Sequence, residues 1–385
     1  MVHAVKIKNG QFEWYRNRWV GTDRIQDAFA RPRAPGARNG IAQEVNTNII
    51  GHNGRIWALV EAGALPVELD AELNTIKHGL FDSNKVAPFS AHPHLDPETG
   101  ELHTITYSPT HLNHIEYVVV NAEHQVIKSQ RIPMKRQPMI HDCALTQKYV
   151  LIFDFPVLFS KTSLLKVSKF PYVWKDKSYA RVGLLPRDGT PADIKWFKLE
   201  QPCMAFHSCN AFDQDDGSVV LDLVVHPKIF PQGAVGPELS TTTFERWTFK
   251  PNSSKVEHQI LSNALQEFPR FDERLSTKPY RFAYAIGASQ DFNKLRYLYR
   301  HDVLSGETIA REFPAGVGPG EFNFIPRHQD AAEDDGWLLT YVMNNNTKTS
   351  DFVILDAKDI LVEPVAVVKL PWLLPFGFHS NWVPD

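Results

Sequence analysis

Four histidines have similar sequence surroundings although dozens of residues separate them along the chain. Each lies among small, apolar or aromatic residues, and the four are His92, His141, His207 and His379. A buried imidazole without a hydrogen-bond partner is costly because it loses its hydration, and imidazole is also the commonest metal ligand in proteins. Each could therefore be a core histidine with its own partner, or the fold could bring all four to one metal ion. The long spacings exclude a local motif such as a zinc finger.

A metal held by four neutral imidazoles needs acceptors for the outer ring N–H groups, because these acceptors fix the orientation of each ring. Three carboxylates lie in stretches that are otherwise apolar or kinked: Glu61, Glu267 and Glu321. We interpret them as candidates for this supporting role. The alternative for each glutamate is an ordinary surface or turn charge, which is the usual place for this residue type.

The elements that must position these residues are predicted to be β-strands. Runs rich in Val, Ile, Tyr, Phe and Thr recur throughout the chain, and turns rich in acidic residues or glycine separate them. Polar turns at 96–100, 213–217 and 333–336 each precede such a run. The pattern predicts an all-β fold, a sandwich or a propeller. We favour the propeller, because its innermost strands converge on an axis where distant histidines can meet.

Composition bounds the class of protein. Hydrophobic residues make up 43% and charged residues 22% of the 385 residues, and the net charge is −3. This slightly negative net charge gives no indication of the basic surface that nucleic-acid binding requires. Three cysteines without CxxC spacing fit a reducing compartment, which predicts a cytoplasmic location. The first ten residues alternate apolar and polar side chains, so they do not read as a signal peptide.

Together these segments resemble the carotenoid cleavage oxygenases, a family that includes apocarotenoid oxygenases, lignostilbene dioxygenases and the retinal isomerohydrolase. The histidine segments that match are AHPHLDPETGEL, IHDCALT, FHSCNAFDQDDG and PFGFHSNWV. Further matches are YRNRWV, ALVEAG, EFPRFDER and AAEDDGWLL. They occur in the family's order over almost the whole chain. Each is weak alone, whereas the set is specific.

The resemblance implies a seven-bladed β-propeller over residues 1–385, with an apolar cap of loops and helix above an axial metal site. It implies Fe²⁺ held by His92, His141, His207 and His379, with Glu61, Glu267 and Glu321 accepting from the imidazole rings. His94 follows Pro93, whereas the family's ligand precedes this proline, so His94 is the second choice. We expect the other histidines to be solvated (His3, His52, His103, His124, His258, His301) or structurally hydrogen-bonded (His226, His328).

The reaction implied by the resemblance is cleavage of a conjugated C=C bond of a carotenoid or apocarotenoid by O₂, which gives two carbonyl products. Three alternatives stay open at this point. They are a stilbene- or phenylpropenoid-cleaving dioxygenase, a redox-neutral isomerase, and a propeller that binds a lipophilic molecule without turnover. Iron content and O₂ dependence distinguish them.

The residue before Glu61 favours a polyene substrate. Stilbene-cleaving relatives have a lysine at this place and a tyrosine upstream that grip the phenol, whereas this chain has Val60 and Phe29. A phenol without a partner would lose hydrogen bonds to water, and a polyene has no such requirement. Phe155, Phe159 and Phe376 are further candidates for substrate contact.

Two further expectations concern the edges of the fold. The segment 155–174 mixes apolar residues with lysines, and it is either an insertion that covers the core or a patch for peripheral membrane contact. Family members also carry a considerable segment before the stretch that matches Met1–Val5. We therefore expect that part of the family's N-terminal segment is absent and that Met1 is not the natural start.

Overall fold

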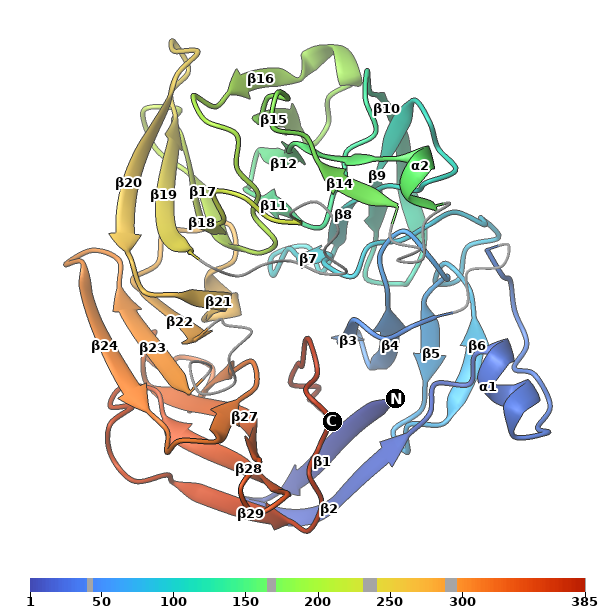
Figure 1. The fold of residues 1–385 in the computed structure, drawn as a ribbon, viewed down its shortest axis with the longest axis vertical. Coiled ribbons are helices and arrows are strands. Elements are labelled where there is room, and N and C mark those ends of the chain that lie inside the picture. Colours follow the sequence, from blue (N-terminus) through green and yellow to red (C-terminus); the bar gives the residue numbers. More distant parts are fainter. Residues whose placement is uncertain (40–43, 165–170, 231–240, 288–295, 385) are drawn as a thin grey trace.

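The computed structural model describes residues 1–39, 44–164, 171–230, 241–287 and 296–384. Antiparallel sheets are arranged around a central axis like the blades of a propeller, and the termini lie near each other (Figure 1). Five of these sheets have four strands and one has five. None of the helices in the described ranges is both long and apolar enough to cross a membrane.

Successive blades follow the chain. The strands of the first three blades are β3 (Asn48–His52), β4 (Arg55–Leu59), β5 (Val67–Leu69) and β6 (Thr75–His78); β7 (His94–Leu95), β8 (Leu102–Thr106), β9 (His114–Val120) and β10 (Val126–Pro133); and β11 (Cys143–Leu145), β12 (Tyr149–Asp154), β15 (Arg181–Pro186) and β16 (Lys195–Lys198). Neighbouring strands in each of these blades are antiparallel. Short turns join most of them, whereas β12 and β15 are connected by a long excursion through residues 155–180.

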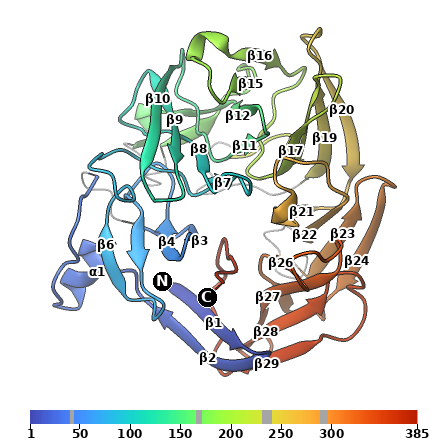
Figure 2. The same cartoon turned by 180° about the vertical axis from the view of Figure 1, so that it is seen from behind.

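The other three blades repeat this plan. Their strands are β17 (Ser208–Asp213), β18 (Val219–Val225), β19 (Thr243–Phe249) and β20 (Val256–Ser262); β21 (Gln266–Phe271), β22 (Phe282–Gly287), β23 (Tyr297–Asp302) and β24 (Glu307–Glu312); and β25 (Val317–Pro319), β26 (Asn323–Pro326), β27 (Gly336–Asn344), β28 (Thr349–Asp356) and β29 (Ala366–Leu370). In the last blade both β25 and β26 pair with β27. After β29, the chain turns inward to the centre of the ring (Figure 2).

The prediction of seven blades is wrong, because the structure has six. The place between the last and the first blade holds only a two-stranded sheet of β1 (Val2–Lys8) and β2 (Gln11–Arg18), which pairs with no further strand among the described residues (Figure 1). A cavity of about 980 Å³ lies beside β1, because two strands fill less space than four. That residues 1–385 form one domain lacking part of the family's N-terminal segment stays a prediction.

Few helical elements accompany the strands. The helices are α1 (Asp23–Ala28) and α2 (Lys161–Leu164), with short 3-10 turns at Pro191–Asp193 and Glu273–Leu275. A small ribbon of β13 (Val157–Phe159) and β14 (Tyr172–Trp174) lies beside α2 over the second and third blades (Figure 1). This is the described part of the predicted cap. Residues 165–170 of the segment considered for membrane contact lie outside the described residues.

The cores lie between neighbouring blades. The largest apolar cluster joins Val119 on β9, Ile152 on β12 and Leu221 on β18, and each of these side chains is at most 3% exposed. Strands that are covered on both faces need apolar residues on both. This explains why β18 reads VVLDLVV and is buried throughout.

Four of the histidines predicted to be solvated are instead buried: His52, His103, His124 and His301. Each has a partner that its place in the sequence did not reveal. His301 lies between Thr308 Oγ1 at 2.9 Å and Gln266 Oε1 at 2.7 Å. Burial lowers the pKa of His301 to about 4. Burial, and then the Arg187 charge, lowers the pKa of His103 to about 3.

These two histidines predict acid destabilisation. In the unfolded chain an imidazole takes up a proton below about pH 6.5, whereas His103 and His301 stay neutral in the fold. Their stabilisation is therefore complete above pH 6.5 and is lost as the pH falls toward 3–4, by up to about 1.4 kcal/mol per pH unit for each group. Urea unfolding between pH 7 and 4.5 measures this slope. His301→Gln should make it shallower, and His328→Gln, at an exposed site, should not. An unchanged slope in His301→Gln would contradict this account.

Candidate metal centre

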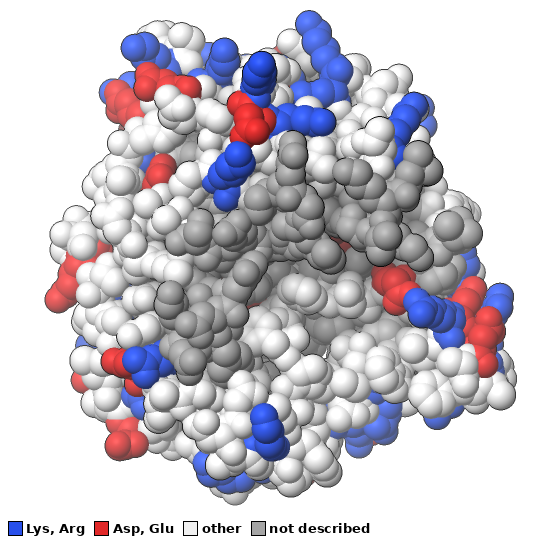
Figure 3. Space-filling view, in the orientation of Figure 1, with Lys and Arg blue, Asp and Glu red and all other residues white. Residues whose placement is uncertain are grey.

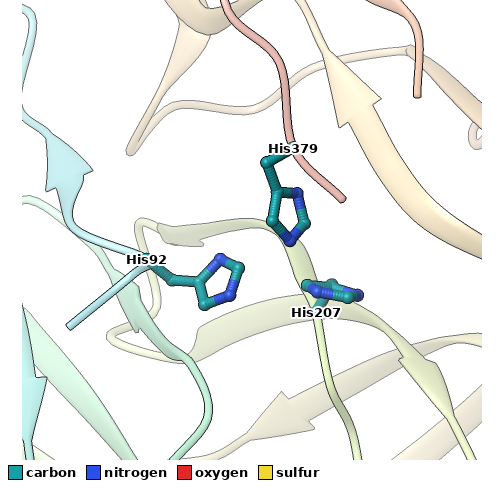
Figure 4. A group of neighbouring side chains, drawn as sticks. All are labelled: His92, His207 and His379. Atoms are coloured by element: carbon teal, nitrogen blue, oxygen red, sulfur yellow. The ribbon is translucent and has the colours of Figure 1, made fainter. Parts of the chain in front are cut away.

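The inner ends of the blades bring the four predicted histidines together on the axis. His92, His141 and His207 each lie just before the innermost strand of a blade, at the entries to β7, β11 and β17. His379 comes from the C-terminal segment, and its backbone N–H donates to Thr47 O at 3.2 Å. Figure 4 shows the rings of His92, His207 and His379 pointing toward one another. Three blades and the chain end therefore supply one side chain each.

The ring nitrogens of three of these histidines are close enough to share one ion, and the fourth ring, His141, approaches one of the three. One nitrogen from each of His92, His207 and His379 lies within 4.8 Å of the other two. The Nε2 atoms of His141 and His207 are 3.3 Å apart. The ring centroids of His92 and His379 are separated by 4.6 Å, and those of His92 and His141 also by 4.6 Å.

Three glutamates hold the outer nitrogens of three of these rings. The Nδ1–H of His141 donates to Glu61 at 3.0 Å, that of His207 to Glu267 at 2.7 Å, and that of His379 to Glu321 at 3.0 Å. This hydrogen bond fixes the tautomer, because the proton on Nδ1 leaves Nε2 with a lone pair. The three lone pairs therefore face the axis. Such a carboxylate on the outer nitrogen is typical of metal-ligating histidines.

The inward nitrogen of His92 lacks a protein donor among the described residues, whereas the inward nitrogens of His141 and His207 face each other. The Nε2 atom of His92 is buried and has no hydrogen-bond partner. Burial, and then the neighbouring imidazoles, keeps the pKa of His92 well below its usual range. His92 therefore stays neutral, and its Nε2 does not gain a proton with which to contact the other rings. Converging lone pairs repel one another unless a cation lies between them. The site therefore fits a divalent transition metal, for which neutral imidazole is a suitable ligand.

The carboxylates are themselves held as anions. Burial would raise the pKa of Glu321, but Arg270, His379 and the Ser380 N–H lower it to about 2. Glu267 is likewise held far below its usual pKa by His207 and His226, although burial acts in the opposite direction. Each anion compensates part of the charge that a metal would bring.

Several supporting residues escaped the sequence analysis. His226 approaches Glu267 Oε1 with Nε2 at 2.5 Å, Arg270 lies 3.5 Å from Glu321, and the Tyr107 hydroxyl donates to Glu61 at 2.9 Å. His226 was predicted to make a structural hydrogen bond, without a link to the centre. No spacing signal marks these residues, because each reaches its carboxylate from another strand or another blade.

Backbone strain accompanies two of the glutamates. Ala62, after Glu61, has φ 45°, and Phe268, after Glu267, has φ 54°. Residues other than glycine seldom adopt this left-handed conformation, and such strain is concentrated at functional sites. At Phe268 it places the ring in a stack on His207, with centroids 4.9 Å apart. The strained residue therefore covers one face of this imidazole.

His94 has a different role from His92. Its Nε2 lies 2.9 Å from the buried Asp142. Burial alone would lower the pKa of His94, but the Asp142 carboxylate raises it well above its usual range. Asp142 also accepts from the backbone N–H of Ser208 at 2.7 Å. The pair therefore ties the segments that carry His92, His141 and His207 to one another.

The predicted substrate residues are dispersed. Val60 is partly buried in the apolar cluster around Val67. Phe29 is 48% exposed at the C-terminal end of α1, a helix that lies on the outside of the ring (Figure 1). Phe155 is buried between Phe153 and Trp247. Phe159 on β13 packs near Tyr172, and Phe376 is 45% exposed in the C-terminal segment. The structure does not bring these five together, and their contact with substrate stays a prediction.

Described charged side chains on one face of the molecule lie mainly near its rim. Figure 3 shows the described Lys, Arg, Asp and Glu residues of this face around a central hollow. The cavity beside β1 reaches the centre from the side and is lined by Glu321 and His379 as well as by apolar residues such as Ile49 and Leu374.

We expect Glu267→Gln to weaken metal binding about 10- to 100-fold, as the loss of other outer partners of ligating histidines does. The amide cannot accept from both His207 and His226 as an anion does. Equilibrium dialysis with iron measures the change. The matched control is Glu245→Gln, because Glu245 also contacts a histidine, His258, at 3.4 Å but lies in the fourth blade away from the axis. Equal iron affinity in both variants would refute the role of Glu267.

Comparison with known proteins gives a consistent assignment. Residues 1–384 match the family described as retinal pigment epithelial membrane protein. The chain is 33% identical to a carotenoid cleavage oxygenase of Mycobacterium tuberculosis, with 100% of this chain and 86% of the relative aligned. It is 29% identical to resveratrol cleavage oxygenase 1 of Botryotinia fuckeliana, over 91% of this chain and 68% of the relative.

Solved structures agree. The lignostilbene dioxygenase of Pseudomonas brassicacearum superposes with a TM-score of 0.87 at 28% identity, covering 99% of this chain and 86% of the other. A cobalt-substituted apocarotenoid oxygenase of Synechocystis gives a TM-score of 0.84 at 26% identity, covering 100% and 87%. These proteins are similar in fold although their names indicate different substrates.

Proposed function

The chain belongs to the family of the carotenoid cleavage oxygenases, and from this premise we propose that it is an iron(II) dioxygenase of carotenoids or apocarotenoids. The observation that carries the proposal is the convergence of imidazole rings on the axis, three of them supported by glutamates on their outer nitrogens. His92, His141, His207 and His379 would hold the iron. When bound, Fe²⁺ supplies the means to bring O₂ to a conjugated double bond.

The residues of this chain supply position and exclusion rather than acid–base chemistry. The glutamates hold the imidazole rings and compensate the charge of the metal. Phe206 and Phe268 contact the rings of His141 and His207 and cover part of their surface. No side chain is required as nucleophile or general base, because a cofactor carries the reaction and the protein orients its partners.

The proposed substrate is a lipophilic polyene, with O₂ as the second substrate. A polyene gains about 25 cal/mol for each Å² of apolar surface that it buries. Val60, in the place of the lysine of stilbene-cleaving relatives, supports this choice. A cytoplasmic location and peripheral contact with a membrane stay predictions.

The similarity to a lignostilbene dioxygenase and to a resveratrol cleavage oxygenase favours one second candidate, a stilbene-cleaving dioxygenase. The Tyr107 hydroxyl already donates its hydrogen to Glu61 at 2.9 Å, so it cannot also donate to a phenolate. We therefore place this candidate second to polyene cleavage.

The central test is aerobic turnover by the iron-loaded protein with a panel of carotenoids, apocarotenals and hydroxystilbenes, with products read by mass. Cleavage of a polyene should require both iron and O₂ and should give two carbonyl products. His379→Ala removes one of four ligands, and it should lower iron content and turnover at least about 100-fold, beyond the loss expected for an outer partner. His258→Ala should change neither. Product formation without O₂ would instead indicate a redox-neutral isomerase.

Val60 provides a test of substrate choice. Val60→Lys places an ammonium beside Glu61 that could pair with a phenolate. We expect hydroxystilbene turnover to rise about 5- to 150-fold relative to polyene turnover, which corresponds to the roughly 1–3 kcal/mol that an unpartnered polar group costs. Val60→Met is the control for side-chain size. High hydroxystilbene turnover already present in the unmodified protein, with no cleavage of any apocarotenal, would overturn the polyene assignment.

A further inference from the structure

A second group of potential metal ligands lies in the second blade, away from the axis. His111 is in the loop between β8 and β9, His114 is the first residue of β9, and Glu116 follows two residues later. Residues two apart on a strand face the same side, so His114 and Glu116 share a face. The loop turns back through the hydrogen bond from His111 N–H to Ser108 O at 3.0 Å, which brings the third side chain to that face.

Each of the three side chains has a potential metal-ligand atom, a ring nitrogen or a carboxylate oxygen, close to those of the other two. One ligand atom from each lies within 4.8 Å of the other two. The rings of His111 and His114 are stacked, with centroids 4.6 Å apart and planes 20° apart. The Nδ1 atom of His111 and the Nε2 atom of His114 are both buried without a hydrogen-bond partner, and His114 Nε2 lies 3.5 Å from Glu116 Oε1.

Two of these ligands are already oriented. The Nδ1–H of His114 donates to Asn113 Oδ1 at 3.0 Å, which leaves the lone pair on Nε2 directed at Glu116. The Ser129 hydroxyl donates to Glu116 Oε2 at 3.0 Å and leaves Oε1 on the side of the histidines. Arg131 lies 3.9 Å from Glu116 Oε1, and its side chain is 75% exposed, so its charge is largely screened by solvent. Outer hydrogen bonds of this kind support metal ligands.

The cluster of His94, Asp142 and Cys143 gives a useful contrast. It is equally compact, but Asp142 is saturated: it accepts from His94, from the Cys143 N–H at 2.7 Å and from the Ser208 N–H and hydroxyl. That cluster is a completed ion pair. The cluster of His111, His114 and Glu116 instead leaves two buried nitrogens and one carboxylate oxygen without a donor between them.

We propose that His111, His114 and Glu116 form a second metal site, distinct from the axial centre, that binds Zn²⁺. Two imidazoles and one carboxylate are a frequent zinc donor set, with water in the fourth position. The ion would place a positive charge among three acceptors and so relieve the unpaired state of both nitrogens. Calcium and magnesium prefer oxygen ligands and are excluded by the two imidazoles.

The position of the site gives it a structural role. Gln137 Nε2 donates to His111 O at 3.3 Å, and Gln137 O accepts from the Phe159 N–H at 2.9 Å. His111 is thus one residue removed from β13, part of the ribbon over the second and third blades. A metal that fixes His111 would also steady this ribbon, without taking part in the reaction at the axis.

The test compares zinc content after equilibrium dialysis of the full chain against Zn²⁺. The axial centre is unchanged in every variant and contributes the same amount of zinc. The difference in zinc content between a variant and the unmodified protein therefore reports on the second site. The unmodified protein should retain one zinc per chain more than His114→Ala or Glu116→Gln, and each variant should bind zinc at this site at least about 100-fold more weakly. His258→Ala and Glu245→Gln are matched controls, since they alter another His–Glu contact, and they should retain the full amount.

Thermal unfolding gives an independent readout. Glu116→Gln keeps the size of the side chain, so it tests the site even if His114→Ala does not fold. Added Zn²⁺ should raise the Tm of the unmodified protein and of Glu245→Gln more than that of Glu116→Gln, because only a ligand that binds the folded state stabilises it. Equal zinc content and an equal rise in Tm in Glu116→Gln and in the unmodified protein would overturn the proposal.

Discussion

The structure depends on one constraint: imidazole rings from distant parts of the chain face one another in a small buried space. The Nε2 atoms of His141 and His207 are 3.3 Å apart, and when each ring carries its proton on the outer Nδ1, the two inner lone pairs repel unless a cation lies between them. The surrounding residues make this arrangement persist. Glu61, Glu267 and Glu321 take the outer protons, and burial of His92 opposes its protonation. The protein therefore holds these rings, at some cost in stability, in an arrangement that suits a bound metal.

The support of this centre extends outward through a second layer of contacts. Glu267 also meets His226, Glu321 meets Arg270, and Glu61 accepts from Tyr107. Arg270 continues to Asn381 at 2.7 Å, which in turn donates to Ile49 O in the first blade. The C-terminal segment is thus tied to both the fifth and the first blade. The contacts that orient His379 are also contacts that hold the ring together, so the site and the fold share the same residues.

The same reasoning separates kinds of histidine across the chain. His301 and His103 are buried with complete hydrogen bonds and need no ligand. His94 is paired with a carboxylate and helps to join three blades. His111 and His114, like His92 on the axis, have a buried nitrogen without a partner. An unpaired buried nitrogen therefore marks a candidate ligand only where other ligand atoms lie beside it, because His226 also has one and instead supports Glu267.

The sequence by itself determined the strand-rich architecture and the segments that carry the axial histidines, because strand periodicity and local composition are encoded in neighbouring residues. It also indicated Glu61, Glu267 and Glu321 through their apolar or kinked surroundings. Only the tertiary structure decided which nitrogen of each ring faces the axis, because this depends on partners that are dozens of residues away. The same reason hid His226 and the burial of His301. The number of blades was also a tertiary outcome: the strands of β1 and β2 are visible in the sequence, but whether a sheet gains further strands depends on which edges meet when the ring closes.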